Sequence, residues 1–126
     1  MSADSPASDQ NRRLADCPAS PNCVSSQASD PARRAQPFAL SGSPAQFMSR
    51  IQSVVAAMPR TRVVEADDIY LHAEFKSALF GFVDDFEVLV DEAAGIAYVR
   101  SASRTGHWDM GANRRRVQLV RRRLEK

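Results

Sequence analysis

The spacing of apolar residues predicts a helix in the middle of the chain. They recur at intervals of three and four, at Phe47, Ile51, Val54, Val55 and Met58. Such intervals place side chains on one face of an α-helix. Ser41 or Ser43 can cap a helix that takes Pro44 as its first residue. We therefore expect a helix that begins at Pro44 and is ended by Pro59.

Beyond Pro59 the apolar residues alternate with polar ones, which predicts strands. Residues 61–82 are expected to form two strands around a tight turn at Asp67 and Asp68. Two further strands follow at 82–90 and 96–103, and Gly95 in the loop between them suits a positive φ.

The register of the last two strands decides which side chains share a face. We expect Val90 to pair with Ile96, which sets Val88 opposite Tyr98. A shift of one residue would reverse the faces, because side chains alternate along a strand.

A basic amphipathic helix is predicted at the C-terminus. Val117, Val120 and Leu124 have the spacing of one helical face. Asp109 or Asn113 can cap this helix, depending on where it begins.

These elements predict an α+β fold, a two-layer sandwich. An antiparallel sheet of four to five strands carries two helices on one face. Residues 17–126 form the single domain, and the polar residues 1–16 form a disordered N-terminal tail. The lead-in segment 17–40 is rich in proline, contains both cysteines and is read as loop, with a short edge strand at 36–40.

Charge is distributed unevenly along the chain, although the net charge of +2 over 126 residues predicts no general attraction to nucleic acid or membrane. Acidic residues dominate 65–92, and basic residues dominate from Arg100 onward. The two regions could attract each other within one molecule or between two copies, but solvated faces are the simpler interpretation.

No segment has the roughly 20 apolar residues of a membrane-spanning helix, and we expect no transmembrane segment. The first residues lack the apolar core of a signal peptide. The sequence as given therefore predicts a cytoplasmic protein, with the bacterial cell envelope as the alternative if a leader has been removed.

Cys17 and Cys23 enclose five residues, and three interpretations stay open. A disulfide is feasible across this loop and would persist only in an oxidising compartment. The cysteines could instead be free thiols, or two of the four ligands of a zinc site. We expect no metal, because the spacing of His72 and His107 from the cysteines does not suggest a shared site.

Asp84 and Asp85 are adjacent on a predicted strand, so their side chains should point to opposite faces. They could divide acid and base roles, but only if they lined one site. We favour a structural role in which one of them binds Arg100, Arg104 or Arg114 and pins the strand to the final helix.

The junction between the last strand and the final helix, 100–116, is crowded with polar side chains. We predict that it binds a small anionic or amphipathic ligand near the free N–H groups of the helix start. The candidate ligand-binding residues are Arg100, Ser101, Ser103, Arg104, Asn113 and Arg114. The alternative is a self-satisfied structural network made by Asp84, Asp85, Asp109, Gly106 and Gly111 together with the arginines.

The arginines of the terminal helix lack interleaved aromatic residues, so we expect no sequence-specific nucleic-acid binding. A solvated face is preferred, and peripheral contact with a membrane stays open. The sequence does not indicate the oligomeric state.

Three motifs together resemble the family catalogued as domain of unknown function 1499. They are CPASPNCVSS, FGFVDDFEV and VRSASRTGHWDMGANRRRV, and the resemblance runs from Cys17 to the C-terminus. It implies no established activity, substrate or cofactor. Bacterial relatives often carry a membrane-targeting or export segment, and plant relatives occur in plastids, whereas the sequence as given departs from the family by lacking such a segment.

Three functions follow, in order of preference. The first is a small-ligand binding module at the junction, without a cofactor. The second is a structural or interaction domain that binds no ligand. The third is a hydrolase-type enzyme in which His107 or His72 acts as base and the arginines stabilise negative charge.

Overall fold

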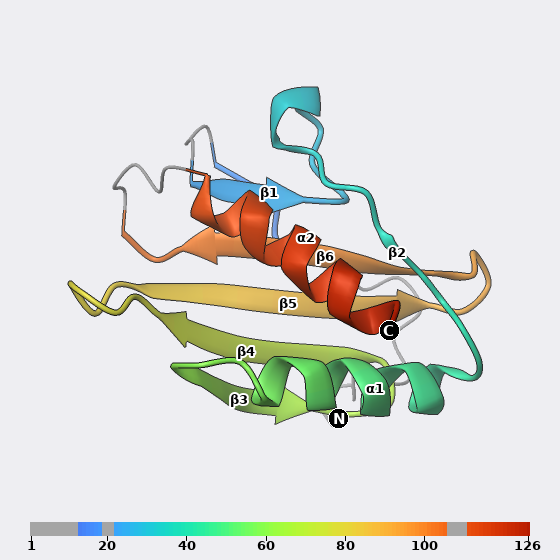
Figure 1. Ribbon diagram of the computed structural model, residues 1–126. Helices are drawn as coiled ribbons and strands as arrows, with labels where there is room; N and C mark the ends of the chain where they lie inside the picture. The colour runs from blue at the N-terminus through green and yellow to red at the C-terminus, as the bar shows by residue number, and fades with distance from the viewer. Residues whose placement is uncertain (1–12, 19–21, 106–110) are drawn as a thin grey trace, which may run out of the picture.

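Two helices lie on one face of a six-stranded antiparallel sheet (Figure 1). The computed structural model describes residues 13–18, 22–105 and 111–126. The elements are β1 (Cys23–Ser25), the 3-10 turn η2 (Pro31–Arg33), β2 (Phe38–Ala39), α1 (Pro44–Ala56), β3 (Thr61–Ala66), β4 (Tyr70–Lys76), β5 (Val83–Asp91), β6 (Ile96–Ser103) and α2 (Ala112–Leu124). The strand order is β1-β6-β5-β4-β3, and β2 also pairs with β6. The predicted α+β sandwich is confirmed.

Helix α1 begins where its sequence predicts. Ser43 caps it in a capping box, in which the Ser43 hydroxyl accepts from the Gln46 N–H and the Gln46 side chain accepts from the Ser43 N–H. The predicted stripe is turned to the sheet, with Val54 partly buried and Met48 joining the buried residues. Apolar spacing and capping together therefore explain this helix.

The register of β5 and β6 differs from the expected one. Val90 pairs with Ala97, and Val88 faces Val99 rather than Tyr98. The ladder closes at Asp91, which the sequence reading had left out of the strand. The Asp91 side chain accepts from the N–H of Ala94. This bond stabilises a hairpin loop that begins one residue later in the chain than expected.

The lead-in segment, read as loop before residue 36, contains an additional strand. β1 pairs with the far end of β6 through Cys23 and Ala102, while β2 pairs with its near end through Phe38 and Ala97. The sequence reading missed β1 because three residues between proline-rich flanks show no alternation. The predicted edge strand at 36–40 is confirmed as β2.

The tail was assigned too many residues. Residues 13–18 lie on the face of the sheet opposite the helices, and Leu14 is buried against Tyr70 and Leu89. Burial of the Leu14 side chain and the bond from its N–H to Gln27 Oε1 both hold this segment to the body of the domain. The rest of the predicted tail, 1–12, lies outside the described residues.

Helix α2 begins without a side-chain cap. Gly111 is its N-cap and has a φ of 78°, a conformation that suits glycine. Asn113, one of the two predicted caps, instead turns inward and is fully buried. The other, Asp109, lies outside the described residues. Within the described ranges, no helix has the length and apolar composition required to cross a bilayer.

Candidate functional site

The alternation of β6 separates the residues that were expected to form one site. Ser101 is fully buried beneath α2, and its Cα partner on β5 is Phe86. Arg100 lies on the opposite face, where its Cα partner is Glu87. The six candidate ligand-binding residues therefore fall into three places: beneath α2, on the open face of the sheet and against the lead-in segment.

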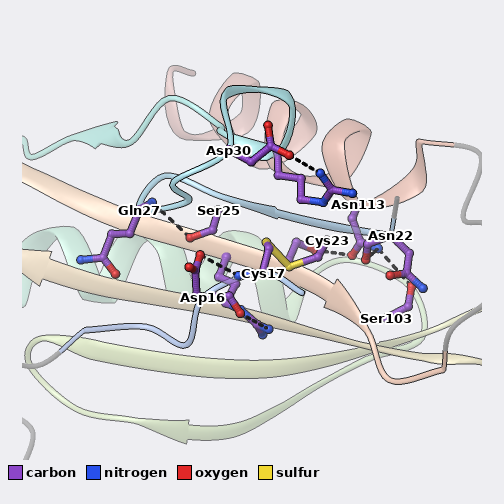
Figure 2. Close-up of a disulfide and its surroundings, with 12 residues drawn as sticks. Asp16, Cys17, Asn22, Cys23, Ser25, Gln27, Asp30, Ser103 and Asn113 are labelled. Carbon is purple, nitrogen blue, oxygen red and sulfur yellow. Dashed lines mark hydrogen bonds and ion pairs between the residues drawn. A yellow bond between two sulfur atoms is a disulfide. The ribbon is translucent and has the colours of Figure 1, made fainter. Parts of the chain in front are cut away.

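Beneath the start of α2, Asn113 is the centre of a buried hydrogen-bond network (Figure 2). Its Oδ1 accepts from the Ser101 hydroxyl at 2.6 Å and from an Arg116 guanidinium N–H at 2.8 Å. Its Nδ2 donates to the backbone carbonyl of Asn22 and to the Ser103 hydroxyl, both at 3.1 Å. The side-chain amide thus makes four bonds, which joins β1, β6 and α2.

Arg116 also links the network to β5. Its Nη1 lies 2.9 Å from Asp84 Oδ2, and its guanidinium lies over the Phe75 ring, 4.6 Å from the centroid. An arginine of the final helix therefore does pin this strand, as expected for one of the two aspartates. The arginine of the helix is Arg116, which was not among the three candidates, whereas Arg104, which was, binds the other aspartate, Asp85. Arg116 lies one turn into α2, and its side chain extends between the helix and the sheet to reach Asp84 on β5.

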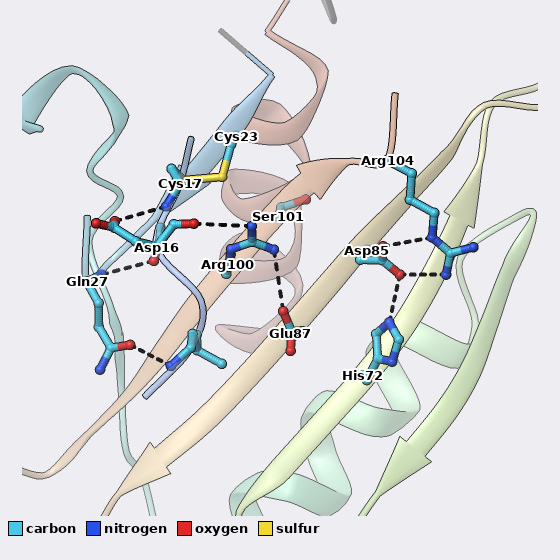
Figure 3. Close-up of polar contacts among 12 residues, drawn as sticks. Asp16, Cys17, Cys23, Gln27, His72, Asp85, Glu87, Arg100, Ser101 and Arg104 are labelled. Atoms are coloured by element: carbon cyan, nitrogen blue, oxygen red, sulfur yellow. Dashed lines mark hydrogen bonds and ion pairs between the residues drawn. A yellow bond between two sulfur atoms is a disulfide. The ribbon is translucent and has the colours of Figure 1, made fainter. Parts of the chain in front are cut away.

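On the open face, Asp85 joins Arg104 to His72 (Figure 3). Arg104 donates to both oxygens of Asp85 at 2.9 Å and also to Glu74 at 2.5 Å. These bonds lower the pKa of both carboxyl groups, with the Arg104 hydrogen bond as the largest cause in each case. Arg104 is therefore held by two ionised carboxylates of the same molecule.

His72 lies beside this cluster, with its Nε2 at 2.7 Å from Asp85 Oδ1. The carboxylate orients the ring, an arrangement that general bases use. Both cysteines are joined in a disulfide, so neither thiol can act as a nucleophile for His72. In the described ranges, no group of three or more His, Cys, Asp and Glu side chains is placed to hold a metal ion. His107, Gly106 and Asp109 lie outside those ranges.

The disulfide between Cys17 and Cys23, whose Cα atoms are 5.6 Å apart, fastens the segment 13–18 to β1 (Figure 2). Arg100 lies at this segment, with one N–H directed at the Asp16 carbonyl at 3.5 Å and Nη1 3.6 Å from Glu87 Oε1 (Figure 3). Its side chain is only 15% exposed. Arg100 is thus enclosed by protein groups rather than presented to a ligand.

One side of α2 binds the lead-in segment through backbone carbonyls. Arg114 donates to the carbonyls of Ala32 and Arg34, at 2.9 and 3.2 Å. Arg121, seven positions later on the same side of the helix, donates to the carbonyls of Gln36 and Pro37. This side of the basic helix, expected to be solvated, therefore fastens the lead-in segment to the domain.

A cleft of about 650 Å³ opens at the C-terminal end of α2. Its apolar lining comes from two strands and two helices, at Phe38, Ile96, Phe47 and Leu124. Two arginines, Arg50 and Arg121, stand in the same lining. Such a combination of apolar surface with a few charged groups is typical of small-molecule sites.

Both arginines of the cleft are held by neutral groups. Arg50 donates to the Ser41 hydroxyl at 2.8 Å and to the carbonyl of Leu124. Arg121 lies over the Phe38 ring, and burial lowers its pKa. Across the described part of the chain, neither guanidinium has a carboxylate within 4 Å. The sequence reading missed this site, although the seven-residue spacing of Arg114 and Arg121 indicated a shared helix side.

Comparison with known proteins identifies the family. Residues 13–124 match the family described as "Protein of unknown function (DUF1499)". The match covers nearly the whole chain, and the chain belongs to this family. No curated protein matches it.

Proposed function

We propose that this member of the DUF1499 family is a binding module for a small amphipathic anion, held in the cleft lined by Arg50 and Arg121. One observation carries the proposal: two guanidinium groups with no carboxylate within 4 Å, among the described residues, stand beside apolar side chains in one cleft, whose lining also includes Glu125. The ligand class is the one expected from the sequence, but the site is at the other end of α2.

The bonds that hold these arginines orient them without neutralising them. A carbonyl oxygen accepts a hydrogen bond but carries no net charge, so the positive charge of the guanidinium persists. Each guanidinium has five N–H donors, and the described protein groups accept from two on each. An incoming carboxylate or phosphate would supply the missing negative charge.

The apolar lining suits the other part of such a ligand. Phe38 and Phe47 form an aromatic pair with centroids 6.5 Å apart, and Ile96 and Leu124 add aliphatic surface. The volume of the cleft falls within the range of small-molecule sites, about 300–1,000 Å³. A short acyl chain or an aromatic ring with one anionic group would match both features.

The junction residues are proposed to be structural. Arg104 is neutralised by Asp85 and Glu74, and Asn113 makes four bonds inside the protein. This corresponds to the self-satisfied network considered as the alternative. Such a network stabilises the fold and leaves few donors for a guest.

Binding can be tested with decanoate, a carboxylate with an alkyl chain, by titration followed in amide NMR spectra. We expect shifts at the cleft, and the variant Arg121→Gln should weaken binding by about tenfold or more. Arg114→Gln is the matched control, because it removes the same kind of carbonyl bond outside the cleft. Equal affinity in Arg121→Gln and Arg114→Gln would contradict the proposal, as would equal binding of uncharged decanol.

We also infer an oxidising compartment, such as the bacterial cell envelope, in place of the cytoplasm expected from the sequence as given. The Cys17–Cys23 disulfide supports this inference, because cytosolic thiols are kept reduced. Protein extracted from its own cells under acid quench and alkylated without reductant should carry no label on either cysteine. Labelling of both would contradict the inference.

A further inference from the structure

The loop between β4 and β5 presents large apolar side chains to solvent at the opposite end of the sheet from the cleft. Leu79 is 81% exposed and Phe80 is 71% exposed. The loop extends from the left end of the sheet in Figure 1. Adjacent exposed apolar residues of this size mark contact sites rather than ordinary surface.

The loop is an ordered turn rather than a loose connection. Its ends are joined by the Ser77 N–H, which donates to the Phe82 carbonyl at 2.8 Å, and Gly81 takes a φ of 70°. The Phe80 and Phe82 rings contact each other, with centroids 5.5 Å apart. Because the base of the turn satisfies its own backbone groups, the tip can enter a less polar medium at lower cost.

Two cations flank the base of this turn. Lys76 lies against it, since a Cβ placed on Gly81 would be 3.6 Å from Lys76 Cε. The Arg60 carbonyl accepts from the Lys76 N–H at 2.9 Å, and Arg60 Nε donates to the Lys76 carbonyl at 3.2 Å. Among the described residues, neither has a carboxylate within 4 Å. The nearby Glu74 is instead paired with Arg62 and Arg104.

We propose that this hairpin tip inserts Leu79 and Phe80 into the interface of an anionic lipid bilayer, while Arg60 and Lys76 bind the headgroups. Apolar side chains beside basic ones, at a protruding tip, have the composition of peripheral membrane anchors. The charge complementarity favours an anionic lipid surface over an apolar protein partner. The proposal is independent of the cleft, which lies at the other end of the sheet.

The test is co-sedimentation of the full chain with vesicles. One set is phosphatidylcholine alone and the other contains about 30% phosphatidylglycerol. We expect binding to the anionic vesicles that weakens with salt, and a loss of about fivefold or more in the double variant Leu79→Ser, Phe80→Ser. Lys76→Glu should reduce binding to the anionic vesicles as well. Val64→Ser is the matched control, because Val64 is exposed at 42% on β3 and lies outside the tip.

Three outcomes would overturn the proposal: no binding of the wild-type chain to either vesicle, equal binding by the double variant, or self-association through the tip. The last would be seen as a dimer of the wild-type chain, without vesicles, that the double variant lacks. The double variant should keep the wild-type melting temperature, since both side chains are exposed. In the variant Phe80→Trp, Trp108→Phe, tryptophan emission should shift to shorter wavelength when anionic vesicles are added.

Discussion

The two ends of α2 use arginine in different ways. At the N-terminal end, Arg116 is paired with Asp84 and hydrogen-bonded to a buried asparagine. At the C-terminal end, Arg121 is held by two backbone carbonyls and an aromatic ring. The first arrangement neutralises charge and closes the structure, while the second fixes a cation and leaves its charge available. A residue type alone therefore does not distinguish a neutralised arginine from one without a carboxylate partner; the groups around it do.

Replacement of Asn113 by Leu should cause the largest effect on stability. The substitution leaves the Ser101 hydroxyl, an Arg116 donor and the Asn22 carbonyl without their buried partner. We expect a loss of about 3 kcal/mol in the free energy of unfolding. Urea denaturation would measure it, with Ser103→Ala as a control that removes one bond at the edge of the network. Equal losses in the two variants would show that the network is not centred on Asn113.

Replacement of Arg121 by Gln should show that the C-terminal end of α2 matters less for stability than the N-terminal end does. It removes two carbonyl bonds and the contact with Phe38, so stability should fall by about 1 kcal/mol. This loss should be close to that of Arg114→Gln, whereas only Arg121→Gln should weaken decanoate binding. A larger loss than in Asn113→Leu would reverse the comparison between the two ends.

The smallest effect concerns acid stability on the open face. Arg104 lowers the folded-state pKa of Asp85 below its ordinary value of 3.8, so this pair contributes stability at neutral pH. That contribution is complete above the unfolded-state pKa and is lost as the pH falls through the folded-state pKa. Unfolding free energies of wild type and Arg104→Gln should therefore differ at pH 6 and converge as the pH falls through the lowered folded-state pKa of Asp85. A difference that persists in acid would assign another role to Arg104.

The helices, four of the strands and the two-layer arrangement follow from periodicity, because burial of one face dominates each of these segments. Strand β1 could not be predicted, because its three residues gain their place from β6 rather than from their own pattern. The register was missed by one residue, because the side chain of Asp91 stabilises the hairpin loop and stays in the ladder. Local sequence pattern therefore predicts most of the helices and strands, whereas tertiary pairing decides where strands end and where β1 forms.

The candidate site was harder to predict than the fold. Alternation along a strand correctly places Asp84 and Asp85 on opposite faces. The same alternation divides Arg100 from Ser101, which the interpretation of a single junction pocket did not take into account. The cleft joins segments far apart in the chain, such as Phe38 and Arg121, and no short motif contains both. The spacing of Arg114 and Arg121 indicates that they share one side of the helix. Only the position of the lead-in segment, whose carbonyls they bind, shows what that side contacts.

The pairing of β6 with both β1 and β2 has a consequence for biosynthesis. A nascent chain emerges from the ribosome N-terminus first, so the two early strands wait for their shared partner until 96–103 has been made. The Cys17–Cys23 disulfide lies within this early segment and constrains it independently of the pairing with β6. Helix α2, which follows β6 in the chain, then binds back onto residues 32–37 of the lead-in segment through Arg114 and Arg121.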